Sequence, residues 1–279
     1  MNPQQQGQPA PPKLPIPGVK NLIAVGSGKG GVGKTTVAVN LALSLAKLGR
    51  KVGLLDADVY GPNVPLMMGT LTAQPVGNAS SIRPVEKYGV RMMSMGFLNP
   101  GDKPLIWRGP MLHSVMQQFL RNVEWGELDY LVIDLPPGTG DVALSLIQSA
   151  PLSGAIIVTT PSEVSLEDAR KAVNMFQQVR VPVLGLVENM SYLIAPHSGE
   201  RIDVFGQGGG KRTATNMKIA YLGELALDPE VRIAGDNGAP VSTREASDAH
   251  AAPFRKLAEV VETRCQQEQT AGPAIIIED

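Results

Sequence analysis

One eight-residue segment, residues 28–35 with the sequence GKGGVGKT, constrains the possible folds of this chain more than any other feature. It matches the Walker A pattern G-x-x-x-x-G-K-[ST]. The glycines allow successive backbone amides to turn toward one point, and the following helix directs the positive end of its dipole there. Such a loop binds the phosphates of a nucleotide, and it requires a strand before it and a helix after it.

The sequence before the loop has the pattern of a strand, and the sequence after it has the pattern of a helix. Residues 21–26 (NLIAVG) form a short apolar run, and Val37, Leu41, Leu45 and Leu48 recur at helical spacing. The loop therefore lies in the strand–loop–helix context that its chemistry requires.

Similar apolar runs, separated by segments with helical periodicity, continue along the chain. Strands are expected at residues 21–26, 51–55, 130–133, 155–159, 183–187 and 220–223, and helices at residues 35–48, 111–123, 140–150, 165–179 and about 251–267. Strands that are apolar on both faces and alternate with helices predict an α/β P-loop NTPase fold, a mostly parallel twisted sheet with helices on both faces.

The two ends differ from this pattern. Residues 1–18 are polar and rich in Pro and Gln, which predicts a disordered leader. We expect a P-loop ATPase domain at residues 19–267 and a short C-terminal tail at residues 268–279.

Charge and cysteine content exclude several classes of protein. With 25 Lys and Arg against 26 Asp and Glu, the balance does not favour a nucleic-acid partner. No stretch approaches the roughly 18 consecutive apolar residues of a membrane helix, so no membrane partner is expected. The single cysteine, Cys265, excludes a disulfide within the chain, and a cytoplasmic location is expected.

Acidic residues follow two of the apolar runs. Asp56 and Asp58 come after residues 51–55, and Asp134 ends the run at residues 130–133. The carboxyl ends of parallel strands meet at the ligand-binding edge of such a sheet. We expect Asp134 to hold Mg²⁺ through water, Asp56 to support the magnesium shell, and Asp58 to orient the attacking water. The alternative is that the two earlier aspartates only form a turn.

The loop's own polar side chains complete this interpretation. Lys34 is expected to reach the β- and γ-phosphates, and the Thr35 hydroxyl to ligate Mg²⁺. Lys29 points out of its own site toward whatever faces it, or else is a solvated surface lysine. The three histidines show no catalytic spacing.

Five further segments narrow the interpretation. They are residues 56–63 (DADVYGPN), 107–111 (WRGPM), 134–141 (DLPPGTGD), 188–192 (ENMSY) and 205–210 (FGQGGG). Together with GKGGVGKTT, they make the chain resemble the Mrp/ApbC-type iron–sulfur cluster carriers, a branch of the deviant Walker A ATPases. The resemblance spans roughly residues 18–265.

The resemblance implies a slow, ATP-hydrolysing homodimer with Mg²⁺ as a cofactor. It implies apo iron–sulfur client or assembly proteins as partners, and a bridging cluster. It also implies that Lys29 contacts the partner subunit's nucleotide, that Asn189 hydrogen-bonds the adenine edge, and that the loop at Asp228 and Pro229 closes over the base. The expected nucleotide-binding residues are Gly28, Lys29, Gly30, Gly31, Val32, Gly33, Lys34, Thr35, Thr36, Asn189 and Pro229. The expected catalytic residues are Lys29, Lys34 and Asp58, and the expected magnesium residues are Thr35, Asp56 and Asp134.

The chain departs from this family at one position. Cluster-binding members have C-P-x-C after the Asn-Met-Ser-Tyr segment, whereas this chain has APHS at residues 195–198. Neither Ala195 nor Ser198 supplies a thiolate, and His197 alone is a poor ligand set. The sequence therefore predicts weak cluster binding or none.

Two other classes of function remain open. A spatial-organisation ATPase of the septum-site or partition type needs a basic amphipathic helix or a basic surface, which the sequence does not indicate. A scaffold that binds ATP without hydrolysing it is distinguished only by measuring turnover.

Overall fold

The computed structural model describes residues 14–98 and 109–271. Residues 1–13 of the expected leader, Trp107 and Arg108 of the WRGPM segment, and residues 272–279 of the expected tail lie outside this part. In the described part, no helix is both long and apolar enough to cross a membrane.

A mainly parallel sheet forms the centre of the molecule, as predicted. Its strands lie in the order β12 (Tyr221–Glu224), β9 (Val183–Glu188), β8 (Gly154–Thr159), β1 (Val19–Gly26), β7 (Leu128–Asp134), β2 (Val52–Asp56), β6 (Val90–Ser94) and β5 (Val85–Lys87). Only β5 runs antiparallel to its neighbour. Because β7 lies between β1 and β2, the ends of these three strands lie side by side.

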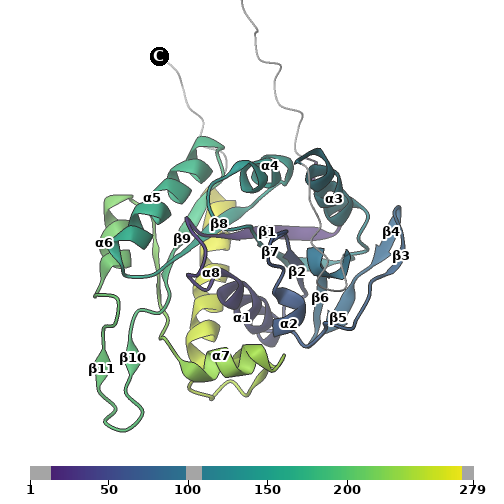
Figure 1. Ribbon diagram of the computed structural model, residues 1–279. Helices are drawn as coiled ribbons and strands as arrows, with labels where there is room; N and C mark the ends of the chain where they lie inside the picture. The colour runs from purple at the N-terminus through teal and green to yellow at the C-terminus, as the bar shows by residue number, and fades with distance from the viewer. Residues whose placement is uncertain (1–13, 99–108, 272–279) are drawn as a thin grey trace, which may run out of the picture.

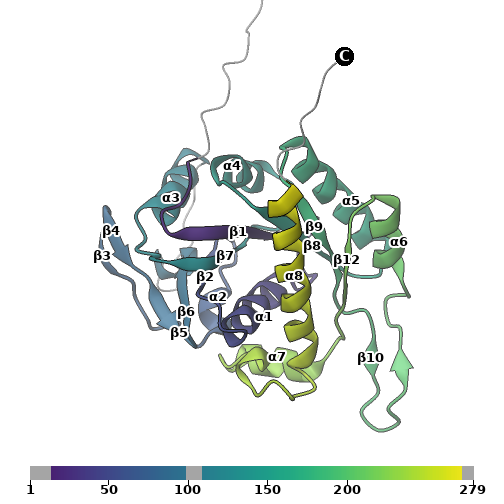
Figure 2. The same ribbon diagram turned by 180° about the vertical axis from the view of Figure 1, so that it is seen from behind.

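Helices cover both faces of this sheet (Figures 1 and 2). One face carries α1 (Lys34–Lys47), α2 (Val64–Met67), α7 (Pro229–Asp236) and α8 (Ala252–Ala271), and the other carries α3 (Gly109–Arg121), α4 (Asp141–Ser149), α5 (Glu163–Gln178) and α6 (Gly209–Asn216). The predicted three-layer architecture is therefore confirmed.

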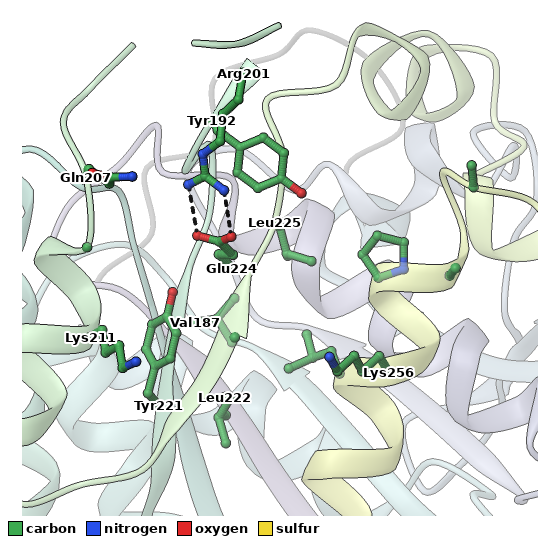
Figure 3. Close-up of a pocket in the computed structure, with 16 residues that line it drawn as sticks. Val187, Tyr192, Arg201, Gln207, Lys211, Tyr221, Leu222, Glu224, Leu225 and Lys256 are labelled. Atoms are coloured by element: carbon green, nitrogen blue, oxygen red, sulfur yellow. Dashed lines mark hydrogen bonds and ion pairs between the residues drawn. The ribbon is translucent and has the colours of Figure 1, made fainter. Parts of the chain in front are cut away.

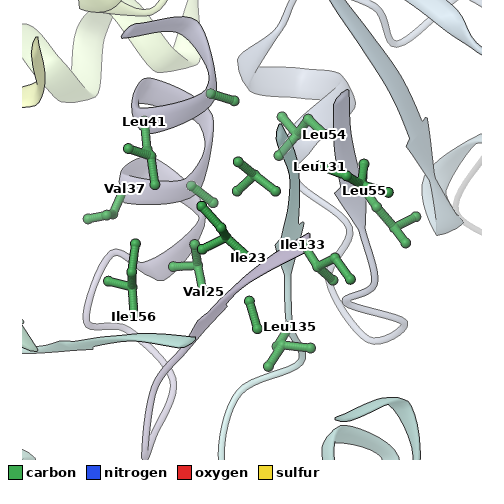
Figure 4. Packing of buried hydrophobic residues seen from close by; sticks show 14 of the residues in the cluster. Ile23, Val25, Val37, Leu41, Leu54, Leu55, Leu131, Ile133, Leu135 and Ile156 are labelled. Atoms are coloured by element: carbon green, nitrogen blue, oxygen red, sulfur yellow. The ribbon is translucent and has the colours of Figure 1, made fainter. Parts of the chain in front are cut away.

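The hydrophobic core extends over both faces of the sheet, and the part next to the phosphate loop lies between α1 and the central strands. Val37 and Leu41 of α1 pack toward Ile23 and Val25 of β1 (Figure 4). All four side chains are fully buried. This packing anchors both segments that flank the phosphate loop.

Several elements do not appear in the sequence-based prediction. They are α2, β5, β6, α6, α7, two 3₁₀ helices (Met95–Leu98 and Val241–Thr243), and the hairpins β3 (Val76–Asn78) with β4 (Ser81–Arg83) and β10 (Leu193–Ile194) with β11 (Arg201–Ile202). β6 has the sequence VRMMS, which is poor in strand-forming residues, and α6 opens with two glycines. Tertiary packing, rather than local propensity, determines the secondary structure of these two segments.

The predicted boundary of the leader is wrong at its C-terminal end. Ile16 is 4% exposed and belongs to the core. Arg121 donates hydrogen bonds to the backbone carbonyls of Leu14 and Pro15 at 2.7 and 2.6 Å. Residues 14–18 therefore pack against the domain. At the other end, α8 continues to Ala271, past the expected residue 267.

We expect Ile16→Ala to lower the free energy of unfolding by about 2–4 kcal/mol, because it removes a buried side chain and leaves a cavity. Leu14→Ala is the matched control, since Leu14 is 62% exposed, and it should change stability by less than about 0.5 kcal/mol. Urea unfolding followed by circular dichroism measures both. Equal effects would show that Ile16 does not pack.

Candidate functional site

The phosphate loop joins β1 to α1, and its shape depends on glycine. Gly31 and Gly33 have φ angles of +79° and +80°, a backbone region that other residues seldom adopt. A Cβ at Gly33 would lie 2.2 Å from the Asn189 side-chain nitrogen, and one at Gly28 would lie 2.1 Å from the Asp168 backbone. A Cβ at Gly31 would meet nothing within 4 Å. The loop is thus closely packed against the protein at Gly28 and Gly33, and open at Gly31.

Asp134 is the centre of the polar site. Lys34 Nζ lies 2.6 Å from Asp134 Oδ1, and the Thr35 hydroxyl donates to Asp134 Oδ2 at 2.7 Å. Lys34 is 6% exposed and Asp134 is fully buried. Burial raises the pKa of Asp134, while the neighbouring Lys34 ammonium opposes this shift. The sequence analysis expected these three residues at one site, and the structure brings them together.

The loop after β7 lies directly against the phosphate loop. The Gly138 N–H donates to the Ser27 carbonyl at 3.0 Å, and the Leu135 N–H donates to the Val25 carbonyl at 3.1 Å. Gly138 also has a positive φ of +86°. Residues 135–138 are therefore hydrogen-bonded to the end of β1 and to the residue that precedes the phosphate loop.

Asp56 is held by protein groups on several sides. Its carboxylate accepts hydrogen bonds from the Ser94 hydroxyl at 2.8 Å and from the backbone amides of Asp58 and Val64 at 3.1 and 3.2 Å. Burial, and then the adjacent Asp134 carboxylate, raise the pKa of Asp56 to about 8. These contacts connect β2 to β6 and α2. A magnesium role for Asp56 stays a prediction.

Asp58 forms the turn that the sequence analysis left as an alternative. Its Oδ1 accepts from the backbone amides of Tyr60 and Gly61 at 3.1 and 3.2 Å. Asp58 is nevertheless 9% exposed and lies two residues beyond the end of β2. Orientation of a water by Asp58 stays a prediction that this turn permits.

The Asn189 side chain forms a hydrogen bond with the backbone of the phosphate loop. Its side-chain amide donates to the Val32 carbonyl at 2.8 Å, and its backbone N–H donates to the Thr159 carbonyl at 2.8 Å. The expected adenine contact is untested. Sequence spacing gives no signal for the contact with Val32, because it joins the end of β9 to a loop more than 150 residues away.

The expected base-covering loop is tied to α7 and to His250 by hydrogen bonds of Asp228. Pro229 is the first residue of α7, and Asp228 caps this helix by accepting from the Glu230 N–H at 2.9 Å. Asp228 Oδ2 also lies 2.5 Å from His250 Nδ1.

The side chain of Lys29, by contrast, has no partner among the described residues. It forms no hydrogen bond or ion pair within residues 14–98 and 109–271.

A network that the sequence analysis did not identify lies at the ends of β9 and β12. The fully buried Glu188 accepts from the Ser191 hydroxyl at 2.6 Å and from the Gly210 N–H. Ser191 Oγ also lies 3.1 Å from Glu224, to which Arg201 donates two hydrogen bonds of 2.9 and 3.2 Å. Single polar residues without a repeat gave no sequence signal for this network.

The segment APHS lies at the tip of the β10–β11 hairpin, which projects from the body of the molecule (Figures 1 and 2). The Ala195 N–H donates to the Glu200 carbonyl at 2.9 Å, and the tip carries no thiol. Cys265 is 3% exposed on α8, and burial raises its pKa to about 12. No group of three His, Cys, Asp or Glu side chains suited to a metal occurs in the described residues.

Comparisons with known proteins agree with this geometry. A family model described as ParA, NUBPL iron-transfer P-loop NTPase, matches residues 18–262. An iron–sulfur cluster carrier protein of Deinococcus radiodurans is 54% identical over 244 residues, covering 87% of this chain and 69% of that protein. A nucleotide-binding protein from Archaeoglobus fulgidus, solved with ADP, is 40% identical with a TM-score of 0.71, covering 80% and 88% of the two chains.

The septum-site alternative receives only fold-level support. The cell division ATPase MinD of Pyrococcus furiosus has a TM-score of 0.63 at 24% identity, covering 87% of this chain and 98% of that one. Similarity at this level shows a shared fold and no shared function.

We expect the Cys265 thiol to be unreactive in the folded protein, because burial keeps it protonated and out of solvent. Labelling with Ellman's reagent at about pH 8 should be about 100-fold slower than in guanidinium chloride, where the thiol is exposed. Cys265→Ser provides the blank. Fast labelling of the native chain would show an accessible thiolate.

Proposed function

Because the chain belongs to the family of NUBPL-type iron-transfer P-loop NTPases, we propose that it is an Mg²⁺-dependent ATPase that acts as a homodimer in iron–sulfur cluster delivery or assembly. The observation that carries the proposal is the buried contact of Lys34 and Thr35 with Asp134 beside the open glycine loop. A cytoplasmic location and apo iron–sulfur client proteins belong to the same proposal.

The residues present fit a magnesium–nucleotide complex. Magnesium keeps several waters and takes one or two protein ligands, so the site needs only a hydroxyl and a nearby carboxylate. Thr35 supplies the hydroxyl, and Asp134, 2.7 Å from it, is placed to hold a coordinated water. Bound magnesium neutralises phosphate charge as it develops.

The chain's own residues then perform three tasks. Lys34 exchanges its contact with Asp134 for the phosphates, and the amides of residues 30–33 hold their oxygens. Asp58 orients the attacking water while its turn fixes the carboxylate. Lys29, which has no side-chain partner in the described part of the chain, crosses to the nucleotide of the second subunit.

The cluster, which is the cargo of this family, does not fit a ligand set on this chain. Stable clusters are usually held by about four thiolates. The hairpin tip offers none, and Cys265 is buried in α8. We therefore propose that thiolates for the cluster come from a partner protein, or that the nucleotide cycle drives a related assembly step.

Asp58→Asn should retain ATP binding and reduce turnover at least about tenfold, because the amide keeps the Oδ1 acceptor of the turn but is not a base. Calorimetry measures ATP binding, and phosphate release measures turnover.

Lys34→Ala is the control that should lose both ATP binding and turnover. Because this change leaves the buried Asp134 without its cation, circular dichroism is needed to check that the variant folds. Wild-type turnover by Asp58→Asn would assign the water to another residue. Absence of turnover in the wild type would favour a non-hydrolysing scaffold.

Lys29→Ala should weaken ATP-dependent dimerisation, because it removes a cation from the opposite subunit's phosphates. Analytical ultracentrifugation with a slowly hydrolysed ATP analogue compares it with the wild type, and Lys51→Ala, an exposed lysine at the other end of the domain, is the control. A wild-type chain that stays monomeric with every nucleotide would exclude the dimer.

After anaerobic reconstitution with iron and sulfide, the wild-type chain should lose its iron on gel filtration. The double change Ala195→Cys with Ser198→Cys should retain iron and a visible charge-transfer band, because it places two thiolates per subunit on the hairpin. Stable iron in the wild type would contradict the proposal. If the wild type retained iron and Cys265→Ser lost it, Cys265 would be identified as a ligand.

A further inference from the structure

A groove of about 810 Å³ lies at the outer edge of the sheet, between α6 and α8 (Figure 3). Strand β12 runs along it. None of the residues assigned above to nucleotide, magnesium or catalysis lines this groove. The groove is therefore distinct from the predicted nucleotide site, although two of its lining residues, Arg201 and Glu224, belong to the network at the ends of β9 and β12.

The edge of β12 that faces the groove is open for pairing. β12 is the last strand of the sheet, and within the described ranges it pairs only with β9. The Leu186 N–H donates to the Ala220 carbonyl, and Leu186 is the register partner of Tyr221. In a parallel pair this pattern turns the amide and carbonyl of Tyr221 to the other side, toward the groove. The bond from the Leu225 N–H to the Glu188 carbonyl does the same for Glu224.

The groove has an apolar floor and room for a second backbone. Leu222, Leu225 and Leu257 line it together with small residues such as Gly223 and Ala252. A Cβ built on Gly223 would meet no atom within 4 Å. Small residues at this edge allow another chain to approach the backbone of β12 closely.

The charges around the groove favour an acidic occupant. Lys211 on α6 and Lys256 on α8 stand on opposite walls, and neither forms an ion pair within the part of the chain that the structure describes. The two remaining charged lining residues, Arg201 and Glu224, form an ion pair with each other, and Arg201 also pairs with Asp203 outside the lining. The lining therefore carries two uncompensated positive charges.

We propose that this groove binds an extended, acidic segment of a partner protein, which adds as a strand to the outer edge of β12. Backbone pairing with Tyr221 and Glu224 supplies affinity, alternate apolar side chains contact the leucine floor, and carboxylates reach Lys211 and Lys256. A small anion would leave the apolar floor and the strand edge unused. This docking site goes beyond the proposed ATPase function and does not depend on it.

The first experiment uses the full chain and a fluorescent peptide in which valine alternates with glutamate and threonine. Fluorescence anisotropy should show saturable binding that weakens with salt. The double change Lys211→Glu with Lys256→Glu should weaken it at least about fivefold, because both exposed lysine contacts are reversed. Lys51→Glu with Lys87→Glu makes the same change in net charge on exposed lysines outside the groove and should have little effect.

A second pair of peptides tests strand addition itself. One peptide is N-methylated at its odd-numbered amides and the other at its even-numbered amides, so that each has one edge blocked for backbone pairing. The peptide whose blocked edge faces β12 should lose binding, and the other peptide should retain it. Hydrogen exchange at Tyr221 and Glu224 should slow when the unmodified peptide binds. Equal binding of both methylated peptides, or equal weakening by the two lysine pairs, would overturn the proposal.

The chain itself has a competing segment with similar chemistry, residues 274–279 (AIIIED). Removal of residues 272–279 should leave the affinity for the peptide unchanged if a partner protein is the occupant. A tenfold or greater gain in affinity would assign the groove to this chain's own C-terminal segment and overturn the assignment to a partner.

Discussion

The buried contact between Lys34 and Asp134 is the interaction on which the rest of the site depends. Two opposite charges withdrawn from water are tolerated only when each is fully satisfied. Lys34 opens α1 and Asp134 closes β7, so this contact joins the helix after the phosphate loop to the strand beside β1. The strand order, with β7 between β1 and β2, is what brings Asp134 to the loop. A phosphate ligand can replace Asp134 as the partner of Lys34, and a magnesium ion beside Thr35 would then compensate the charge of Asp134.

The parts predicted correctly from sequence are those with a local physical cause. Residues 21–26 and 130–133 are apolar on both faces, and the glycines of residues 28–33 have a conformational requirement that few other loops share. The roles of Asp56, Asn189 and Ile16 depend instead on segments distant in the chain. No local pattern reveals that Asn189 bonds to Val32, or that Arg121 fixes the backbone before β1. Strand β6 was missed because its pairing with β2, rather than its composition, makes it a strand.

The hairpin without thiols is still physically connected to the nucleotide site. Arg201 joins the hairpin to Glu224, and Ser191 joins Glu224 to Glu188, the residue before Asn189. Asn189 in turn holds the backbone of the phosphate loop. These contacts therefore link the phosphate loop to the hairpin in a chain whose hairpin lacks cysteine.

The close approach of Asn189 to Gly33 has a consequence for how such a site can change over generations. The amide nitrogen occupies the space that any Cβ at position 33 would need, so the glycine is fixed by its neighbour as well as by its φ angle. A larger residue at position 33 would displace the Asn189 amide, and a displaced or smaller side chain at position 189 would leave the Val32 carbonyl without this donor. Substitutions at these two positions, far apart in the chain, are therefore expected to have coupled effects on the phosphate loop.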